Sequence, residues 1–218
     1  MNLFVIIFYM MNKLGWYTLL IAMCGDLLFS LLLSFGYKGY SNLTMSISAL
    51  GNPNSPVRLP FNIWMVIEGL LFLIAIPFFI KAYQQVGRGL TITTVIFIGL
   101  FAVGACIFTG FFSVNETKDV VTTASKIHGA GSTIGFMLFL FVPLLAGILC
   151  FKDQDKALSM ICIICFIISL VFFVLFVMSD KPEFANTIIS YEGLWQRLNL
   201  LFMYAPLAVI AVKKILAA

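Results

Sequence analysis

The sequence predicts an all-α polytopic membrane protein, a bundle of six transmembrane helices. Hydrophobic residues make up 62% of its 218 residues, charged residues make up only 10%, and the mean hydropathy is +1.09. Soluble domains contain about 45–50% apolar and about 25% charged residues. Because a chain of this size cannot bury so much apolar surface in its own core, we expect lipid to be its solvent.

Six apolar runs are each long enough for a membrane helix, which needs about 20 residues. They cover residues 15–36, 61–81, 90–112, 128–151, 157–178 and 193–212. No soluble domain, low-complexity segment or internal repeat is left between them. We therefore expect residues 15–218 to form a single six-helix transmembrane domain.

Residues 1–14 are set apart as an N-terminal segment. The stretch "MNLFVIIFYMM" is apolar but too short to span a bilayer. It lacks the basic start and the small-residue cleavage site of a signal peptide. Two interpretations stay open: an interfacial segment, or a misplaced start, since Met11 begins a natural start of its own.

Lysine and arginine in the loops predict the orientation, because cytoplasmic loops carry an excess of both. With the N-terminus inside, seven basic residues fall on the inner side: Lys13, Lys81, Arg88, Lys152, Lys156, Lys213 and Lys214. Five fall on the outer side: Lys38, Arg58, Lys118, Lys126 and Lys181. We expect a multi-pass protein of a prokaryotic plasma membrane with both termini in the cytoplasm.

The cysteines and the single histidine limit which metals or cofactors the chain could hold. Cys162 and Cys165 form a CxxC motif, but it lies inside a candidate membrane helix. Zinc needs about four ligands and thioredoxin chemistry needs a βαβ setting, and neither is available. A single histidine excludes bis-histidine haem ligation. We expect no metal and no cofactor, and the small net charge of +4 gives no reason to expect a nucleic-acid partner.

Four ionisable residues stand out inside the apolar runs, where a charge is costly and indicates function by default. They are Asp26, Glu68, His128 and Arg197. In the predicted topology Glu68, His128 and Arg197 fall in the outer half of the bilayer, and Asp26 falls near its middle. The sequence therefore predicts a polar pocket that opens outward, with Asp26 as its floor.

The long first outer loop contributes a further candidate to this pocket. The part "NLTMSISAL" can form a short helix that lies on the membrane or dips back into the pocket, and Ser48 and Asn52 are its polar candidates. The rest, "GNPNSPVRLP", is a rigid series of turns. The predicted ligand-binding residues are Ser48 and the four ionisable residues, Asp26, Glu68, His128 and Arg197.

Structural alternatives stand beside each of these roles. Glu68 and Arg197 could form a buried ion pair that only fixes helix packing, or Arg197 could reach up to outer-leaflet phosphates. Asp26 has no lysine or arginine at its depth. It could be protonated, hydrogen-bonded to Ser30 or to a neighbouring helix, or serve as a proton relay or solute ligand.

His128 is the candidate catalytic residue, although no reaction is assigned. It could instead anchor the helix end through a hydrogen bond to a loop carbonyl. Ser132 lies one turn later on the same side, which suggests a hydrolase, but serine in a membrane helix usually bonds its own backbone. Gly131 and Gly135 form a small-residue face that lets another helix approach closely.

Four segments occur in an order that identifies a family. They are "SISALGNPNSP" at 46–56, "GACIFTGFF" at 104–112, "IHGAG" at 127–131 and "GLWQR" at 193–197. Together they resemble the prokaryotic membrane family called domain of unknown function 998, over nearly the whole chain from Met11 onward. The serine loop followed by prolines is also similar to the Frag1/DRAM group of six-helix membrane proteins, which implies a link to lipid remodelling.

Three functions remain in contention. The first is a protein that binds a lipid headgroup or lipid-linked molecule in the outward-facing pocket, with Arg197 holding a phosphate and His128 donating a hydrogen bond or proton. The second is a small-solute or proton-coupled transporter that uses Asp26. The third is a structural or assembly protein without a ligand. Membrane lipid is the expected partner, a homo-oligomer is an open alternative, and whether any reaction is catalysed is left open.

Overall fold

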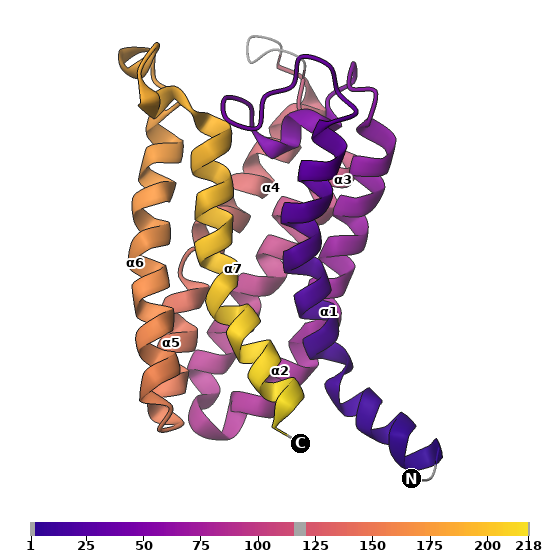
Figure 1. Cartoon of the computed structure of the whole chain (residues 1–218), viewed down its shortest axis with the longest axis vertical. Coiled ribbons are helices and arrows are strands. Elements are labelled where there is room, and N and C mark those ends of the chain that lie inside the picture. Colours follow the sequence, from indigo (N-terminus) through magenta and orange to yellow (C-terminus); the bar gives the residue numbers. More distant parts are fainter. Residues whose placement is uncertain (1–2, 116–120, 218) are drawn as a thin grey trace.

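The computed structural model describes residues 3–115 and 121–217, with side chains from residue 13 onward. Within these ranges the chain is helical and contains no strand, so the all-α prediction is confirmed. The helices stand side by side in one bundle, and both ends of the chain lie at its lower end in Figure 1. We call this the terminal end, and the opposite end, which carries the loops at 35–57 and 179–191, the loop end.

The first helix, α1 (Leu3–Ser34), continues through the predicted N-terminal segment without a break. Its first turns project away from the bundle at the terminal end (Figure 1), and the rest packs against α2 and α7. The Lys13 ammonium donates a hydrogen bond to the Ile215 carbonyl near the end of α7. An interfacial position for residues 3–14 stays a prediction.

A helical stretch of 54 residues follows the first loop. It consists of α2 (Arg58–Phe101), the π-helical segment η2 (Ala102–Ile107) and α3 (Phe108–Phe111). At Gly87 the backbone leaves the helical region, with φ −174° and ψ 89°. The two halves then pack against each other in antiparallel fashion. The close approach of their backbones shows this packing: a Cβ built on Gly69 would lie 2.6 Å from the Ala102 carbonyl oxygen. The stretch therefore folds back at Gly87.

The next predicted run divides into two helices, α4 (Thr123–Phe139) and α5 (Val142–Lys152). Thr122 caps α4: its hydroxyl accepts from the Ser125 amide at 3.1 Å, and the Ser125 hydroxyl accepts from the Thr122 amide at 3.0 Å. The helix is interrupted at residues 140–141, just before Pro143 in the first turn of α5. Proline suits that position because its missing N–H has no partner there.

Two long helices complete the bundle, α6 (Lys156–Met178) and α7 (Glu192–Leu216). Asp155 begins α6: its carboxylate accepts from the Leu158 amide at 3.3 Å and also forms an ion pair with Lys213 of α7. Two short 3₁₀ turns, η3 (Pro182–Phe184) and η4 (Ile188–Ser190), lie in the connection at the loop end.

The described part of the chain has five helical stretches that could cross a membrane, whereas the sequence predicts six. The five that are long and apolar enough are Lys13–Ser34, Arg58–Phe111, Thr123–Lys152, Lys156–Met178 and Glu192–Leu216. Six separate spans are thus not confirmed. The runs at 61–81 and 90–112 share one helical stretch, since the polar residues between them stay helical on both sides of Gly87.

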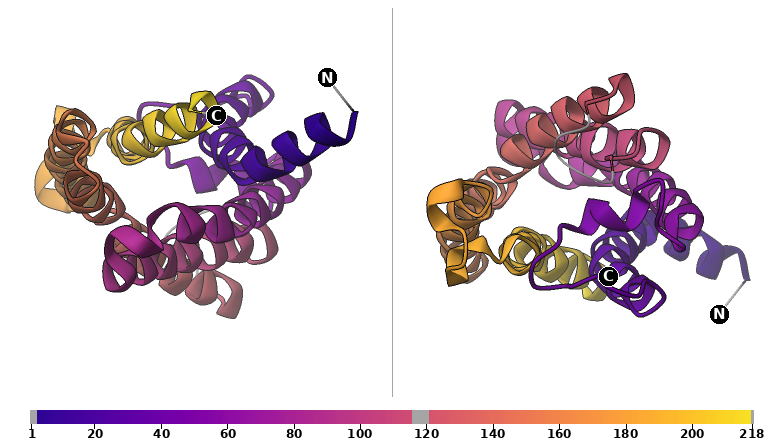
Figure 2. Two further views of the ribbon diagram at one scale, coloured as in Figure 1. Left: turned by 90° about the horizontal axis from the view of Figure 1, so that it is seen from below. Right: turned by 90° about the horizontal axis from the view of Figure 1, so that it is seen from above.

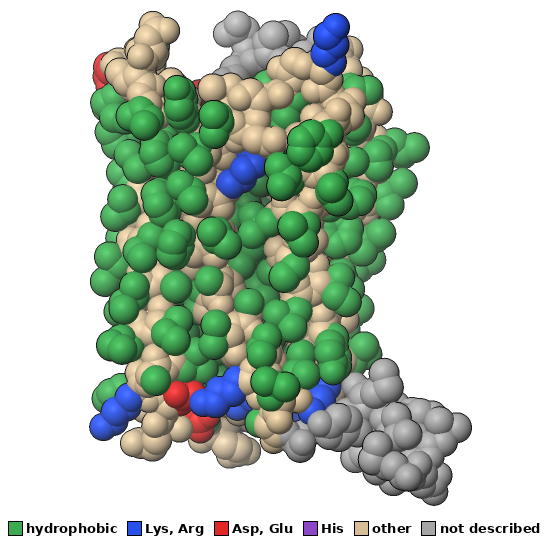
Figure 3. All heavy atoms as spheres, in the orientation of Figure 1, with side chains coloured by type: hydrophobic (Ala, Val, Ile, Leu, Met, Phe, Trp, Pro, Cys, Tyr) green, Lys and Arg blue, Asp and Glu red, His purple; other side chains and the backbone are tan. Residues whose placement is uncertain are grey.

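On the face shown in Figure 3, apolar side chains cover the wall of the bundle, and lysine and arginine side chains gather at the terminal end. Helix α6 is the least enclosed of the five, with 17% of its most apolar window buried. Helices α6, α7, α1 and α2 are neighbours in that order, and α4 packs on α2 and η2. Figure 2 shows that α4 and α6 stand apart from each other at the loop end. Lys118, which the orientation counted, lies outside the described residues.

The small-residue face on α4 makes the close contact that the sequence predicts. A Cβ built on Gly104 of η2 would lie 2.4 Å from the Gly131 carbonyl oxygen, and one on Gly131 would lie 2.8 Å from the Gly104 carbonyl oxygen. A Cβ on Gly135 would lie 3.1 Å from the Ala105 side chain. The backbones of α4 and η2 therefore touch, and this contact brings His128 beside the end of α3.

Candidate functional site

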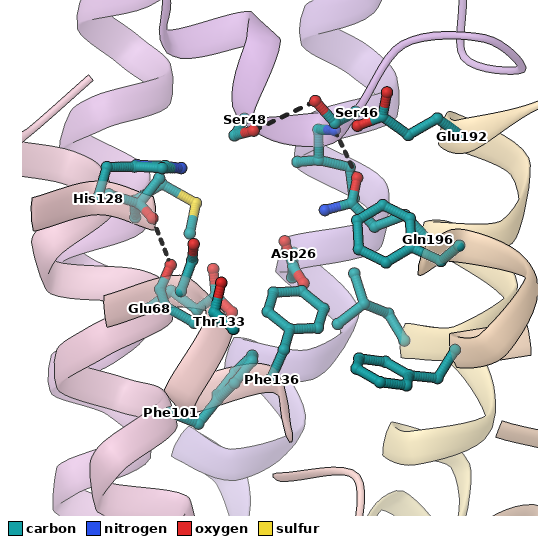
Figure 4. A pocket seen from close by; sticks show the side chains of 18 of the residues that line it. Asp26, Ser46, Ser48, Glu68, Phe101, His128, Thr133, Phe136, Glu192 and Gln196 are labelled. Carbon is teal, nitrogen blue, oxygen red and sulfur yellow. Dashed lines mark hydrogen bonds between the residues drawn. The ribbon is translucent and has the colours of Figure 1, made fainter. Parts of the chain in front are cut away.

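A cavity of about 220 Å³ lies inside the loop end of the bundle. Side chains from α1, η1, α2, η2, α3, α4, α6 and α7 line it. Four of the five predicted ligand-binding residues are among them: Asp26, Ser48, Glu68 and His128. Figure 4 shows these side chains around one shared space.

Asp26 lies in this cavity, in the last third of α1, and is 4% exposed. Its Oδ2 accepts a hydrogen bond from the Tyr204 hydroxyl of α7 at 2.8 Å. The predicted bond to a neighbouring helix is therefore confirmed. Ser30, the other predicted partner, donates to the Leu27 carbonyl of its own helix instead. A buried carboxyl that keeps one bond to another helix is free to present its second oxygen to a ligand.

Glu68 of α2 is completely buried against the same cavity. Its Oε1 lies 3.6 Å from the Cys106 thiol of η2, which is a weak donor. Its Oε2 has no hydrogen-bond partner among the described residues. The ion pair with Arg197 that the sequence left open is wrong, because each of the two side chains has other surroundings.

His128 of α4 is anchored by a loop carbonyl, as one of the sequence interpretations expected. Its Nδ1 lies 3.0 Å from the Phe112 carbonyl oxygen just beyond α3. A carbonyl oxygen only accepts, so Nδ1 carries the proton in this bond. In the neutral ring Nε2 is then an acceptor, and Figure 4 shows the ring directed into the cavity. One histidine thus joins two elements and still presents a nitrogen to the cavity.

Ser132, one turn after His128, also lines the cavity. Its hydroxyl donates to the Gly129 carbonyl of its own helix at 3.3 Å. This is the backbone bond that serine usually makes in a membrane helix. The arrangement offers no activated nucleophile at this position.

Arg197, the fifth predicted residue, does not line the cavity. Its Nη1 donates to the carbonyls of Asn42, Met45 and Gly193 at 3.0, 3.3 and 3.0 Å. Its Nη2 donates to the Tyr40 hydroxyl at 2.7 Å and to Asn42 Oδ1 at 2.8 Å. The guanidinium therefore fastens the loop at 35–57 to α7. Its predicted role in binding a phosphate stays a prediction.

Tyr40 completes this fastening from the loop side. Its hydroxyl accepts from Arg197 and donates to the Ser46 carbonyl at 2.9 Å. Burial raises the pKa of the Tyr40 phenol, although the neighbouring guanidinium partly offsets the effect. The hydroxyl therefore stays protonated and keeps its donor role.

The loop that Arg197 fastens folds into the cavity. This is one of the two positions that the sequence predicts for its short helix, the other being on the membrane surface. Its short 3₁₀ helix η1 (Ile47–Gly51) buries Ile47 and Leu50 in the core. The Ile47 amide donates to Gln196 Oε1 of α7 at 2.7 Å, and the Ser46 and Ser48 hydroxyls lie 3.3 Å apart. Asn52, the other polar candidate, bonds Tyr37 and Asn54 and does not line the cavity.

Several lining residues were not predicted. They are neutral polar side chains, one acid and a set of phenylalanines: Ser46, Thr109, Thr133, Gln196, Glu192, Phe61, Phe101, Phe136, Phe173 and Phe176. Gln196 directly precedes Arg197 in the motif "GLWQR", and that position could have suggested it. The phenylalanines carry no such signal in a chain with 23 of them.

Aromatic rings close the cavity toward the terminal end. Phe72, Phe101, Phe139 and Tyr204 pack against one another with centroids 4.3–6.3 Å apart. All four are almost completely buried. We call these four residues the aromatic cluster. It separates the carboxyls of the cavity from the half of the bundle that carries the termini.

The side of the cavity between α4 and α6 is less enclosed. Thr133 of α4 and Val177 of α6 both line the cavity, and both are exposed on the surface of the bundle. In the described part of the chain, these two helices share at most a marginal backbone contact. The Phe136 and Phe176 rings lie across this gap with centroids 6.5 Å apart. We call this gap the lateral opening.

The described residues contain no group of three or more His, Cys, Asp or Glu side chains that could hold a metal ion.

No curated protein and no solved structure matches the chain. The expected similarity to the Frag1/DRAM group is therefore not shown. A model of the family described as "Protein of unknown function (DUF998)" matches residues 20–213, nearly the whole chain. This match covers all the lining residues and the loop fastened by Arg197, and the chain belongs to the DUF998 family.

Proposed function

We propose that this protein binds a membrane lipid, with the polar headgroup in the loop-end cavity and the acyl chains in the bilayer. One observation carries the proposal: buried polar groups and a side opening toward lipid belong to the same cavity. Asp26, Glu68 and His128 form the polar part, and exposed Thr133 and Val177 form the edge. A free solute needs no opening at the height of the acyl chains.

The size of the cavity supports partial entry of the ligand. Sites that enclose whole drug-sized molecules usually measure about 300–1,000 Å³. At about 220 Å³ this cavity is smaller and suits a headgroup alone. Apolar side chains of the lateral opening, Phe136, Phe173 and Phe176, then contact the first methylene groups of the chains.

The proposal includes six membrane crossings in a cell membrane, with the termini in the cytoplasm. The 54-residue stretch would extend about 80 Å as one straight helix, far beyond a hydrocarbon core of about 30 Å. Its fold-back at Gly87 fits two crossings. An even number also fits the position of both ends of the chain at the same end of the bundle, where lysine and arginine gather.

The first outer loop is the lid of this binding site. Arg197 fastens the loop to α7, and the loop in turn places Ser46 and Ser48 at the cavity. We assign Arg197 a positioning role, because all the bonds of its Nη atoms go to the chain itself. Ser48, Gln196 and His128 then offer uncharged polar groups to the headgroup.

Native mass spectrometry in a mild detergent tests the proposal. We expect wild type to retain a lipid adduct, and Thr133→Trp to lose it, because the larger side chain blocks the lateral opening. His128→Ala should weaken the adduct. Lys126→Ala, an exposed position two residues before His128, is the control and should keep it. Equal adducts in wild type and Thr133→Trp would overturn the proposed site, and a bare wild-type protein would favour a structural role.

A proton-coupled transporter is the second candidate, because Asp26 and Glu68 are buried carboxyls inside a membrane-spanning bundle. Transport requires access from both sides, whereas the aromatic cluster blocks the path to the terminal end. Asp26→Cys tests this: modification by a small thiol reagent from the cytoplasmic side of inverted vesicles would favour transport. Protection from that side, with modification from the outer side, would favour the binding site.

A further inference from the structure

We propose that the ligand group in the cavity is a protonated primary amine. The inference rests on the proposed function and narrows it to one headgroup chemistry. The amine could belong to an aminophospholipid or to a free organic amine. Asp26 and Glu68 accept its hydrogen bonds, and His128 contributes a further acceptor.

The balance of charge in the cavity points to a cationic ligand. Three acids line it, Asp26, Glu68 and Glu192, and its described lining includes no lysine or arginine. Arg197 lies outside the lining, and its Nη donors are engaged by the loop and by Gly193 of α7, although its charge still acts on Asp26. A phosphate placed directly beside these carboxyls would meet repulsion, so in an aminophospholipid the amine lies beside the carboxyls and the phosphate lies nearer the lateral opening.

Glu68 supplies the sharpest observation. Its carboxyl is fully buried, yet Oε2 has no hydrogen-bond partner among the described residues, and Oε1 lies 3.6 Å from the weak Cys106 thiol donor. The nearby Tyr204 hydroxyl donates its proton to Asp26. A carboxylate accepts about four hydrogen bonds, and a buried polar atom without a partner is destabilising. Because the side chain lines the cavity, a ligand that brings N–H donors satisfies it.

His128 adds an acceptor and no donor on the cavity side. Nδ1 is engaged by the Phe112 carbonyl oxygen, so the neutral ring presents Nε2 as an acceptor. Figure 4 shows His128 and Asp26 directed into the same space from opposite walls, with Glu68 below them. A primary ammonium group has three donors and no acceptor, which complements this set.

The aromatic lining fits a cation as well. Phe61, Phe101 and Phe136 line the cavity, and the faces of aromatic rings attract cations within about 6 Å. A quaternary ammonium group would gain from the rings but brings no hydrogen-bond donor for Glu68. The lining therefore favours a primary amine over a trimethylated one.

Three lipids with identical acyl chains test the headgroup in native mass spectrometry of the full chain. They are phosphatidylethanolamine, phosphatidylcholine and phosphatidylglycerol. We expect phosphatidylethanolamine to bind at least about tenfold more tightly than either of the others, which corresponds to the loss of one charge-assisted hydrogen bond. Equal binding of all three would overturn the amine and leave the lipid site standing.

Isosteric variants locate the selectivity. Glu68→Gln and Asp26→Asn keep the shape of the side chains and should each reduce the preference for phosphatidylethanolamine over phosphatidylglycerol to about threefold or less. Glu183→Gln, which removes an exposed acid in the loop-end connection, should leave the preference unchanged. A preference that survives both cavity substitutions would overturn the assignment to these carboxyls.

Free ethanolamine separates the two sources of the amine. If it binds with the same dependence on Glu68 while no lipid is retained, the amine is supported and lipid binding fails. If neither ethanolamine nor any lipid binds to wild type, both proposals fail. Displacement of phosphatidylethanolamine only at a large excess of ethanolamine is the result that we expect, since the acyl chains add affinity.

Discussion

At the scale of single residues, Arg197 shows how one side chain can organise a loop. Its planar guanidinium reaches three backbone carbonyls, a phenol and a side-chain amide at once. A fixed fork of donors suits such a set of acceptors, whereas a lysine ammonium is a compact point charge. The position of Ser46 and Ser48 at the cavity depends on this network.

Arg197→Lys should therefore destabilise the protein by about 2–4 kcal/mol, because several part-buried carbonyls lose their donors together. The measurement is the apparent melting temperature in detergent, together with protease cleavage of the loop at 35–57. Arg58→Lys, an exposed arginine on the same side, should change neither. A stable variant with a protected loop would show that the network is dispensable.

The residues of the site differ in how far the sequence could predict them. Asp26, Glu68 and His128 were predictable, because ionisable side chains are rare within apolar runs. The partners of Arg197 were not, since backbone carbonyls have no sequence signature. Thr133 was not either, because neutral polar residues in membrane helices usually bond their own backbone.

At the scale of helices, the contact between α4 and η2 has almost no spare room. Gly104 and Gly131 bring two backbones together, and a Cβ on either would approach a carbonyl oxygen of the other closer than 3.0 Å. Backbone atoms on both sides cannot move aside as a flexible side chain can. This contact fixes the position of His128 relative to the Phe112 carbonyl.

Gly131→Ala should lower the stability by about 2 kcal/mol or more through this overlap. Gly129→Ala is a matched control on the same helix, because a Cβ there meets nothing within 4 Å. Alanine at that position should be neutral or stabilising by up to about 1 kcal/mol, since it favours the helix. Thermal unfolding of both variants in one detergent compares them. Equal midpoints would contradict the close contact.

Asp155 makes the start of α6 sensitive to pH. A hydrogen bond from Lys213 lowers the pKa of its carboxyl below the ordinary 3.8. The charge therefore stabilises the fold above that value, and the effect is lost as the pH falls through the lowered pKa. Asp155→Asn retains a capping acceptor and should lower the melting temperature at pH 7 by only about 1–2 °C.

Unfolding of Asp155→Asn and wild type between pH 7 and pH 3 checks this expectation. The difference should shrink toward zero at the acidic end. Asp155→Ala also loses the cap and should melt lower than Asp155→Asn at every pH. A difference that grows as the pH falls would rule out the assigned sign.

The apolar runs were predictable as helices, but their divisions were not. A hydrophobic run of about 20 residues identifies a segment that can form a membrane helix, but it does not show where the backbone leaves the helical conformation. The chain departs at one residue, Gly87, and stays helical through the polar residues around it. The break at 140–141 was hidden for the opposite reason, because both sides of it are apolar.

At the scale of the whole molecule, the two ends of the bundle differ. The loop end contains the cavity with its carboxyls, and the terminal end carries Lys13, Lys152, Lys213 and Lys214. The aromatic cluster lies between them. In the described part of the chain, a cavity near one end with an opening at the side suits binding from the bilayer more closely than passage across it.

The proposed orientation predicts which exposed positions a membrane-impermeant maleimide reaches on intact cells. Lys38→Cys lies in the loop-end segment 35–57, so we expect it to be labelled. Gln84→Cys and Gln154→Cys should react only after the membrane is opened, because six crossings place both turns in the cytoplasm; all three positions are exposed. The parent chain, whose described cysteines are all free, measures the background. If Gln84→Cys alone joins Lys38→Cys in being labelled on intact cells, the 54-residue stretch does not cross the membrane twice. If instead Gln84→Cys and Gln154→Cys are labelled and Lys38→Cys is protected, the orientation is reversed and the cavity faces the cytoplasm.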